Sequence, residues 1–379
     1  MARNIVICCD GTGNEIGEHQ SNVLKLYRVL KKDATQIVYY DPGLGTMGAD
    51  NEWGRLKQGT EKVAGLAFGY GLDKFVLDAY NFLASNFKEG DRIFLFGFSR
   101  GAYAVRVLAG FINCIGILDE NQSNLAGYAF VAYKKIVEGG NFGPVRIFEQ
   151  ALRPQRPPIR FLGLWDTVSS VIVPRRDRMY LPSLRQLAYT QRNPSIQTVR
   201  HALAIDERRR MFRPFLWSEG EQYFGGPFKG KSAVPQDVRQ VWFAGVHSDI
   251  GGGYAEEESG LSKISLKWMV DECPEELKWV RQSVNQIVCG KDRKGSSYEY
   301  LEPNPEGEMH ESLRRLWWAV EWLPKRTKYR EDPSRKSLLG HYFPNAEARR
   351  IPPGAEIHSS VKERLTRVPQ YRPMNLPQG

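Results

Sequence analysis

The stretch DRIFLFGFSRGAYAVRVLAGF, residues 91–111, decides the fold. Residues 93–98 are almost continuously apolar, which is typical of a strand buried on both faces of a parallel sheet. The glycine-flanked turn GFSRG follows at 97–101, and the residues after it favour a helix over 101–117. The sequence therefore predicts a strand, a sharp turn that carries Ser99, and a helix.

Strand and helix patterns alternate on both sides of this stretch. We predict further strands at NIVICC (4–9), TQIVYY (35–40), PIRFLGLW (158–165) and VRQVWFAGV (238–246), and further helices over 22–32 and 61–87. Strands that alternate with helices form a mainly parallel sheet with helices on both faces. The expected fold class is therefore α/β.

The domain organisation is read as one domain over residues 1–379. Insertions are expected near 120–155, 168–235 and 275–345, where the patterning is irregular. The second of these lies in a stretch rich in proline and arginine, and it reads as a cap or lid rather than as part of the sheet. The sequence contains no internal repeat and no low-complexity tract.

GFSRG matches G-x-S-x-G, the turn that lifts a serine hydroxyl above the sheet as a catalytic nucleophile, and with the strand before it and the helix after it this motif indicates the α/β-hydrolase type of α/β fold. We predict that Ser99 is this nucleophile. A serine nucleophile needs a histidine base and an acid that orients the base, and in this fold they follow in the order Ser, Asp or Glu, His. The rest of the site is therefore sought downstream of residue 99.

Two aspartates and two histidines compete for these roles. Asp249 lies in the loop HSDIGGGY just past a predicted strand and is the predicted acid, while Asp166 ends the strand FLGLWD and is the alternative. His358 stands in GAEIHSSVKERL, a loop that enters a helix near the C-terminus, and is the predicted base. His247 is the rival base or a residue that lines the site, because a base only two residues from Asp249 would be awkward to orient.

The oxyanion hole is expected to use the backbone N–H of Arg100, the residue after the nucleophile. A second N–H is expected from the turn DGTG after the first strand, from Gly11 or Thr12. Asp10 is expected to brace this turn through its carboxylate.

Glycine-rich and cysteine patterns argue against cofactor and metal chemistry. GLGTMG at 43–48 matches a dinucleotide-binding pattern, but no apolar helix follows it, so a loop beside the serine site is the better interpretation. The five cysteines show no C-x-x-C spacing and are expected to be reduced thiols. We therefore expect no cofactor and no metal in the serine mechanism.

The chain carries a net charge of +10, which favours contact with polyanions. Between Gln150 and Phe215 thirteen arginines stand against four acidic residues, either as a solvated face or as an anion-binding face. LRRLWWAVEWLPKR at 313–326 places Trp317, Trp318 and Trp322 beside basic residues, which suits either a helix core or a membrane–water interface. No signal peptide or membrane-spanning run is evident, so we expect synthesis in the cytoplasm, with secretion by a signal-independent route left open.

Seven ordered stretches resemble one known family. They are NIVICCDGTGNE, YYDPGLGT, FGFSRGAYAVRVLAG, FLGLWDTVSS, HALAIDERRRMFRP, VWFAGVHSDIGGGY and the ending from IHSSVKERL to YRPMNLP. The chain is similar to the α/β-hydrolase family of type VI secretion phospholipase effectors. The resemblance implies phospholipase A activity through a Ser-Asp-His triad, with the family's three residues falling on Ser99, Asp249 and His358.

The sequence thus predicts a serine acyl-ester hydrolase that acts on phospholipid or another acyl ester, with contact to a membrane surface, no expected nucleic acid partner and an unknown protein partner. Two alternatives stay open. One is a divalent-metal phosphoesterase using Asp10, Asp166, His247 and Asp249, and the other is a non-enzymatic module that binds through a basic face.

Overall fold

The computed structural model describes most of the chain. The described residues are 2–11, 17–43, 61–139, 142–168, 172–174, 182–184, 187–228, 233–291, 298–313, 316–322, 324–327, 331 and 335–377.

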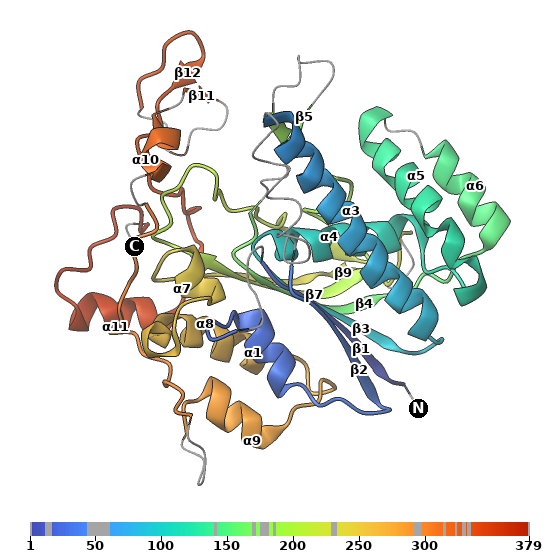
Figure 1. Cartoon of the computed structure of the whole chain (residues 1–379), viewed down its shortest axis with the longest axis horizontal. Coiled ribbons are helices and arrows are strands. Elements are labelled where there is room, and N and C mark those ends of the chain that lie inside the picture. Colours follow the sequence, from blue (N-terminus) through green and yellow to red (C-terminus); the bar gives the residue numbers. More distant parts are fainter. Residues whose placement is uncertain are drawn as a thin grey trace.

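A seven-stranded sheet forms the centre of the molecule, in the order β13-β10-β7-β4-β3-β1-β2 (Figure 1). Every pairing in it is parallel. Its strands are β1 (Asn4–Cys9), β2 (Gln36–Asp41), β3 (Arg92–Phe98), β4 (Ile159–Trp165), β7 (Ile196–Ala204), β10 (Asp237–Phe243) and β13 (Glu356–Ile357). The predicted α/β fold class is confirmed. The carboxyl ends of all the strands meet at one edge of the sheet, where loops from distant parts of the sequence are brought together.

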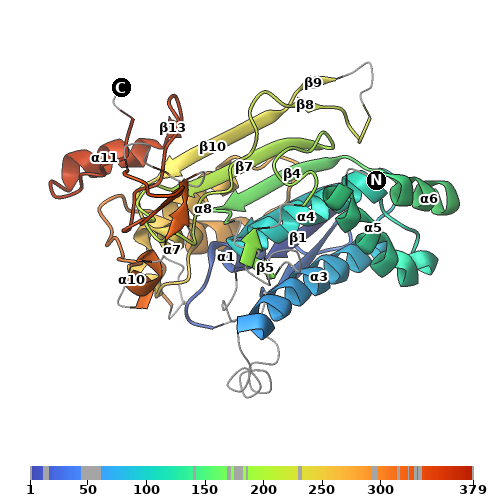
Figure 2. The same ribbon diagram turned by 90° about the horizontal axis from the view of Figure 1, so that it is seen from above.

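Helices cover both faces of the sheet (Figures 1 and 2). One face carries α3 (Glu61–Asn86), α4 (Arg100–Ile115), α5 (Ala126–Gly139) and α6 (Gly143–Leu152), and the other carries α1 (Asn22–Val29) and α8 (Gly260–Asp271). Strand β1 shows why two layers form. Ile5, Ile7 and Cys9 pack into one hydrophobic core and Val6 and Cys8 into the other, as the two-residue period of a strand requires.

Shorter elements lie at the ends of the sheet and beyond its edges. The helical ones are η1 (Glu120–Leu125), α7 (His247–Gly251), η3 (Glu256–Glu258), α9 (Arg281–Ser283), η4 (Val284–Val288), α10 (Leu316–Glu321) and α11 (Ser359–Arg367). The extended ones are β5 (Ile172–Pro174) with β6 (Pro182–Leu184), β8 (Gln222–Tyr223) with β9 (Val234–Pro235), and β11 (Lys325–Arg326) with β12 (His341–Tyr342).

One predicted insertion is wrong in part. Residues 168–235 were expected to form a cap or lid, but β7, inside this range, lies in the sheet between β4 and β10. Polar side chains of this strand form ion pairs or hydrogen bonds with neighbouring parts of the fold. Arg200 forms ion pairs with Asp237 and Glu272, and the buried His201 accepts a hydrogen bond from the Thr167 N–H at 3.1 Å. That the whole chain is one domain stays a prediction.

None of the described helices is both long and apolar enough to cross a membrane. All five cysteines are free thiols: Cys8, Cys9 and Cys114 are buried, and Cys273 and Cys289 are partly buried.

Candidate active site

Ser99 lies at the turn between β3 and α4, as the sequence predicts. Its backbone has a positive φ of 58° with ψ −123°, which is strained for a residue with a side chain. The flanking glycines explain why the turn can be so tight. A Cβ atom on Gly97 would lie 2.7 Å from the Ala102 backbone, and one on Gly101 would lie 2.3 Å from the Asp10 carbonyl oxygen.

The imidazole beside the Ser99 hydroxyl belongs to His247, the first residue of α7. Its Nε2 atom lies 2.8 Å from Ser99 Oγ. The ring packs against Phe98 at a centroid distance of 4.7 Å and meets Phe212 edge-on at 4.8 Å. The His247 side chain is therefore held by two aromatic rings with its Nε2 directed at the hydroxyl.

The other ring nitrogen of His247 is paired with Asp166, which follows β4. His247 Nδ1 lies 2.5 Å from Asp166 Oδ2, and both groups are buried. With the proton on Nδ1 donated to this carboxylate, Nε2 is left to accept the proton of Ser99. The order Ser99, Asp166, His247 is the chain order expected for this fold.

Asp166 is ionised although it is fully buried. Burial raises the pKa of its carboxyl group, but the charge of Arg349 and the hydrogen bond from His247 outweigh this effect and hold the pKa well below its usual value. Arg349 Nη1 donates to Asp166 Oδ1 at 2.6 Å, and Nη2 donates to Oδ2 at 2.9 Å. A carboxylate that is charged at neutral pH therefore faces the imidazole.

The main chain of His247 is fixed by a second buried carboxylate, that of Glu207. The His247 N–H donates to Glu207 Oε2 at 3.2 Å. Arg209 pairs with the same carboxylate at 2.9 Å, and its guanidinium lies 3.6 Å above the Phe212 ring. Burial raises the pKa of Glu207, but its hydrogen bond and charge interaction with Arg209 bring the pKa below its usual value.

The structure corrects the predicted base, His358. This residue is the N-cap of α11, next to the edge strand β13, and its ring stacks on Phe243 at 4.5 Å. Its Nδ1 atom contacts Ser360 Oγ at 2.9 Å and accepts the Ser360 N–H at 3.3 Å. His358 therefore caps a helix, and His247 occupies the place beside Ser99.

The structure also corrects the predicted acid, Asp249. Its carboxylate accepts the Val246 N–H at 3.0 Å and the His310 N–H at 3.2 Å, and it contacts His310 Nδ1 at 2.7 Å. Asp249 thus fixes the start of α7 and joins it to the segment at 310, while the carboxylate on His247 comes from Asp166.

His310 lies between two carboxylates, Asp249 and Glu258, and stacks on Tyr254 at 3.5 Å. The hydrogen bond that His310 donates to Asp249 raises the pKa of His310, against a smaller opposing effect of burial. Because the pKa of His310 is raised in the folded state, the protonated imidazole stabilises the fold. This stabilisation is fully present below the unfolded pKa of about 6.5 and is lost as pH rises through the folded pKa.

We expect the His310→Gln variant to be destabilised by about 1 kcal/mol or more at pH 6, the scale of a hydrogen bond to a charged group, and by less at pH 9. Thermal unfolding of the variant and the wild type across this pH range measures the difference. His341→Gln, an exposed histidine whose Nδ1 contacts the Leu339 carbonyl, serves as the control. A penalty for His310→Gln that does not vary with pH would contradict this account.

The predicted oxyanion residues lie at the start of α4 and in the turn after β1. Arg100 is the first residue of α4, so its N–H belongs to the first turn of a helix. The N–H of Gly11 donates to Asp10 Oδ1 at 2.7 Å, and Asp10 Oδ2 also accepts from Tyr40 Oη at 2.9 Å and from Ser21 Oγ. Asp10 thus braces its own turn. Thr12 lies outside the described residues, as does GLGTMG beyond Gly43.

The four residues proposed for a metal site are each engaged in hydrogen bonds within the protein. Asp166 and His247 are paired with each other, while Asp10 holds the turn after β1 and Asp249 holds His310. Across the described ranges, no group of three or more His, Cys, Asp or Glu side chains is arranged to hold a metal ion. This donor set does not fit a divalent cation.

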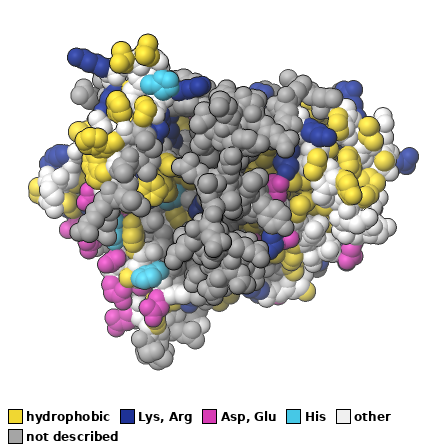
Figure 3. Space-filling model, turned by 45° about the horizontal axis from the view of Figure 1, so that its top comes forward, with side chains coloured by type: hydrophobic (Ala, Val, Ile, Leu, Met, Phe, Trp, Pro, Cys, Tyr) yellow, Lys and Arg dark blue, Asp and Glu magenta, His cyan; other side chains and the backbone are white. Residues whose placement is uncertain are grey.

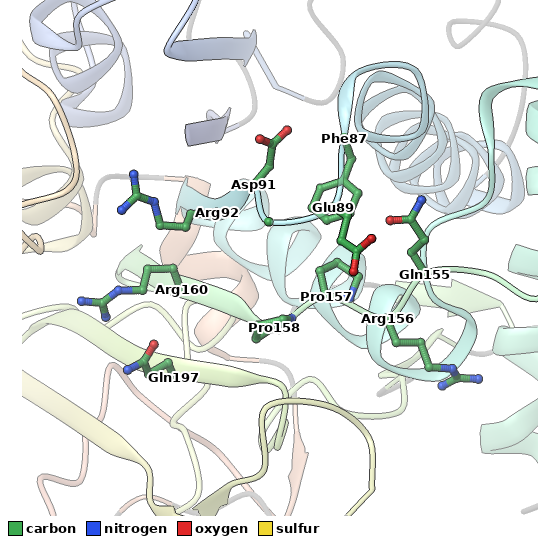
Figure 4. Close-up of a pocket in the computed structure, with 11 residues that line it drawn as sticks. Phe87, Glu89, Asp91, Arg92, Gln155, Arg156, Pro157, Pro158, Arg160 and Gln197 are labelled. Atoms are coloured by element: carbon green, nitrogen blue, oxygen red, sulfur yellow. The ribbon is translucent and has the colours of Figure 1, made fainter. Parts of the chain in front are cut away.

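A hollow of about 580 Å³ lies at the other end of the sheet. Figure 4 shows Arg92 and Arg160 on one side of it and Arg156 on the other. It lies where β3 and β4 begin, about one strand length, or roughly 20 Å, from the end of β3 where Ser99 stands. Because of this distance, the hollow is separate from the Ser99 site. Two of its arginines are paired with acidic residues, Arg160 with Glu276 at 3.2 Å and Arg156 with Glu149 at 3.4 Å.

A family model described as "T6SS, Phospholipase effector Tle1-like, catalytic domain" matches residues 3–272, more than half of the chain. The chain belongs to this family. The family resemblance predicted from the sequence is thereby confirmed. The matched range of this Tle1-like catalytic domain includes Ser99, Asp166, His247 and Asp249, whereas Arg349 and His358 lie beyond it.

The relatives of this Tle1-like domain include a curated protein from yeast. The uncharacterized protein YEL023C of Saccharomyces cerevisiae is 34% identical over 560 residues, covering 99% of this chain and 81% of the yeast protein.

Two solved structures are similar over part of their length. An uncharacterized protein from Pseudomonas aeruginosa is 19% identical with a TM-score of 0.38, covering 72% of this chain and 46% of that one. The Tle1 effector bound to the VgrG spike from the type 6 secretion system is 24% identical with a TM-score of 0.34, covering 69% and 53%. This chain spans about half the length of these two solved chains.

Proposed function

We propose that this chain is a serine hydrolase that cleaves acyl esters of phospholipids, with Ser99 as nucleophile, His247 as general base and Asp166 as the acid that orients the base. Membership of a phospholipase effector family implies lipid hydrolysis. The observation that carries the finer proposal is the continuous chain of contacts Ser99 Oγ, His247 Nε2, His247 Nδ1 and Asp166 Oδ2, at 2.8 Å and 2.5 Å.

In the first half of the reaction, Ser99 Oγ attacks the acyl carbon while His247 Nε2 takes the hydroxyl proton. The carbonyl π bond opens, and the resulting oxyanion is stabilised by the Arg100 N–H. The Gly11 N–H, which donates to Asp10 Oδ1 in this structure, would have to change partner to act as the expected second donor. When the bond to the leaving oxygen breaks, the imidazolium gives its proton to that oxygen and the lyso-lipid alcohol departs. The acyl group is now an ester of Ser99.

In the second half, water attacks this acyl-enzyme. His247 takes a proton from the water, and the acyl carbon to Ser99 Oγ bond then breaks. The same proton returns to Ser99, so that a fatty acid leaves and the free enzyme is restored. Ionised Asp166 stabilises the imidazolium that forms twice in this cycle.

Phospholipid vesicles test this function. We expect the wild-type chain to release lyso-lipid and fatty acid, identified by mass spectrometry, and Ser99→Ala to release neither above background. Hydrolysis by Ser99→Ala at the wild-type rate would contradict the serine mechanism. Products of phosphate-ester cleavage in place of fatty acid would contradict the assignment of acyl esters as the substrate.

We propose that the chain meets the membrane through a protruding apolar surface, here called the apolar knob. It consists of exposed side chains in and just after α10 and in residues 338–343 around β12: Trp318, Trp322, Leu338, Leu339 and Phe343. Leu338 and Leu339, just before β12, are 79% and 90% exposed, an arrangement that suits insertion among lipid chains. Figure 3 shows apolar side chains together with basic ones on this projecting part, at the upper left.

The charge around the apolar knob and the position of the knob both support a lipid surface as its binding partner. The exposed Arg326 and Lys336 flank it and would attract anionic head groups. The knob is also continuous with the Ser99 site, because Trp317 on α10 contacts Phe212 at 5.6 Å and Phe212 contacts His247 at 4.8 Å. A membrane bound at the knob would therefore lie next to the candidate catalytic residues.

We expect Leu339→Asp to weaken binding to anionic phospholipid vesicles by at least about 10-fold, because burial of one leucine is worth about 1.5–3 kcal/mol. Vesicle hydrolysis should fall in proportion, while hydrolysis of a soluble short-chain ester stays unchanged. Ile147→Asp, which alters an exposed apolar residue of α6, is the matched control. Vesicle binding that both variants retain fully would contradict the role of the apolar knob.

A further inference from the structure

Arg349 is a buried arginine that reaches the candidate triad from the C-terminal part of the chain. It lies between β12 and β13, beyond the range 3–272 that the family model matches. Its side chain is 3% exposed. A guanidinium buried this deeply is costly unless it is paired, so its partners indicate what it does.

The guanidinium binds Asp166 with two parallel hydrogen bonds, Nη1 to Oδ1 at 2.6 Å and Nη2 to Oδ2 at 2.9 Å. The Ala204 N–H donates to Oδ1 at 3.0 Å and His247 Nδ1 contacts Oδ2 at 2.5 Å. Each carboxylate oxygen thus accepts two hydrogen bonds, which is its full capacity. The carboxylate cannot turn without breaking several of them, and its orientation toward His247 is fixed.

The same guanidinium also holds the loop that follows β7. Nη1 donates to the Ala204 carbonyl at 2.9 Å and Nη2 to the Phe212 carbonyl at 2.5 Å. Phe212 is the residue whose ring meets His247 edge-on at 4.8 Å. One side chain therefore fixes both the carboxylate on His247 and an aromatic ring that packs against His247.

We propose that Arg349 is a positioning residue for the hydrolysis, which acts through Asp166 and Phe212 to hold His247 in line with Ser99. This inference rests on the proposed function. It extends the functional unit from three residues to four and places the fourth in the C-terminal part of the chain.

The charges around Asp166 come from several elements. Arg349 and His247 face it directly, and His201 on β7 lies close by, with a pKa well below its usual value because of burial and the charge of Arg106. Glu207 and Glu331 act on the guanidinium of Arg349. Because Arg349 supplies the largest effect that lowers the pKa of Asp166, its removal should let this buried carboxyl group take up a proton at a higher pH.

Arg364 on α11 offers a matched control. It is also buried, and its Nη1 donates to the Pro305 and Gly307 carbonyls at 2.7 Å and 2.8 Å. In both arginines the buried Nε has no hydrogen-bond partner among the described residues. Like Arg349, Arg364 is therefore buried and donates hydrogen bonds to backbone carbonyls, but it does not contact Asp166.

The experiment compares Arg349→Met, Arg349→Lys, Arg364→Lys and Ser99→Ala with the wild type. Each protein is assayed with a soluble short-chain p-nitrophenyl ester across pH 5–9, and the folded fraction is measured by circular dichroism. We expect Arg349→Met to lower kcat about 100-fold with KM nearly unchanged, the effect of misplacing a reacting group by about 1 Å. The acid limb of its pH profile should move to higher pH. Arg349→Lys should recover part of kcat, because it restores the charge but not the two-pronged geometry.

Three results would overturn the inference. One is a folded Arg349→Met that keeps wild-type kcat and pH profile. Another is equal losses of kcat per folded molecule in Arg349→Lys and Arg364→Lys, and the third is the failure of both Arg349 variants to fold, since a purely structural role would then account for the contacts. Ser99→Ala separates this inference from the proposed function. If Ser99→Ala stays active the proposed function fails, and if Ser99→Ala is inactive while the Arg349 variants keep full activity only the role of Arg349 fails.

Discussion

Replacing His247 with glutamine is expected to lower kcat for ester hydrolysis by about 10⁶-fold, the loss found when the base of a serine triad is removed. Glutamine can contact Ser99 but cannot take up its proton, so the hydroxyl stays a weak nucleophile. The rate is measured with a soluble short-chain ester, which separates the chemical step from membrane binding.

His358→Gln is the control for this prediction, because His358 is the base that sequence reasoning favours. Its ring stacks on Phe243 and caps α11, so its replacement should reduce stability slightly and leave kcat within a few fold of the wild type. The reverse pattern, with His358→Gln inactive and His247→Gln active, would contradict the proposed site.

Replacing Asp166 with asparagine is expected to lower kcat by about 10⁴-fold. The amide no longer supplies the negative charge that stabilises the imidazolium, and its NH₂ group would favour the tautomer of His247 with the proton on Nε2. That tautomer cannot accept the proton of Ser99. The measurement is kcat at neutral pH together with the folded fraction of the variant.

Asp249→Asn is the control for Asp166→Asn, since Asp249 is the acid that sequence reasoning favours. Its carboxylate holds the start of α7 and His310, so the variant should unfold at a lower temperature and yet keep most of its kcat. Loss of kcat by 10³-fold or more in Asp249→Asn, with kcat retained in Asp166→Asn, would reverse the assignment.

Much of the fold could be predicted because its strands are long, apolar and separated by helices. The sequence locates strand β3 and the turn GFSRG within a residue or two, and β1, β2 and β4 likewise, whereas the predicted end of β10 lies three residues beyond Phe243. Strand β7 was missed because Arg200 and His201 interrupt its apolar pattern. Their ion pairs and hydrogen bonds form only after β10 and α8 are in place, so local sequence cannot reveal them.

The candidate site could be predicted only in part. Ser99 follows from a local pattern, whereas the choice of partners depends on how loops from separate strands meet. Asp166 and His247 were each weighed against another residue but were not paired with each other, although their chain order satisfies the fold's rule as well as that of Asp249 and His358. Strands β4 and β10 end at the same edge of the sheet, and this brings Asp166 and His247 together.

Arg349 has no sequence signal of its own. It lies among prolines and exposed charged residues, and its partner Asp166 is 183 positions away along the chain. Only the packed structure shows that its guanidinium meets the carboxylate on His247.

The most direct test of the central claim, that Ser99 is a nucleophile activated by His247, is reaction with a fluorophosphonate probe followed by peptide mapping. We expect one labelled peptide, containing Ser99, in the wild type and in His358→Gln, and almost no labelling in His247→Gln. Labelling at another residue, or equal labelling of Ser99 in His247→Gln, would contradict it.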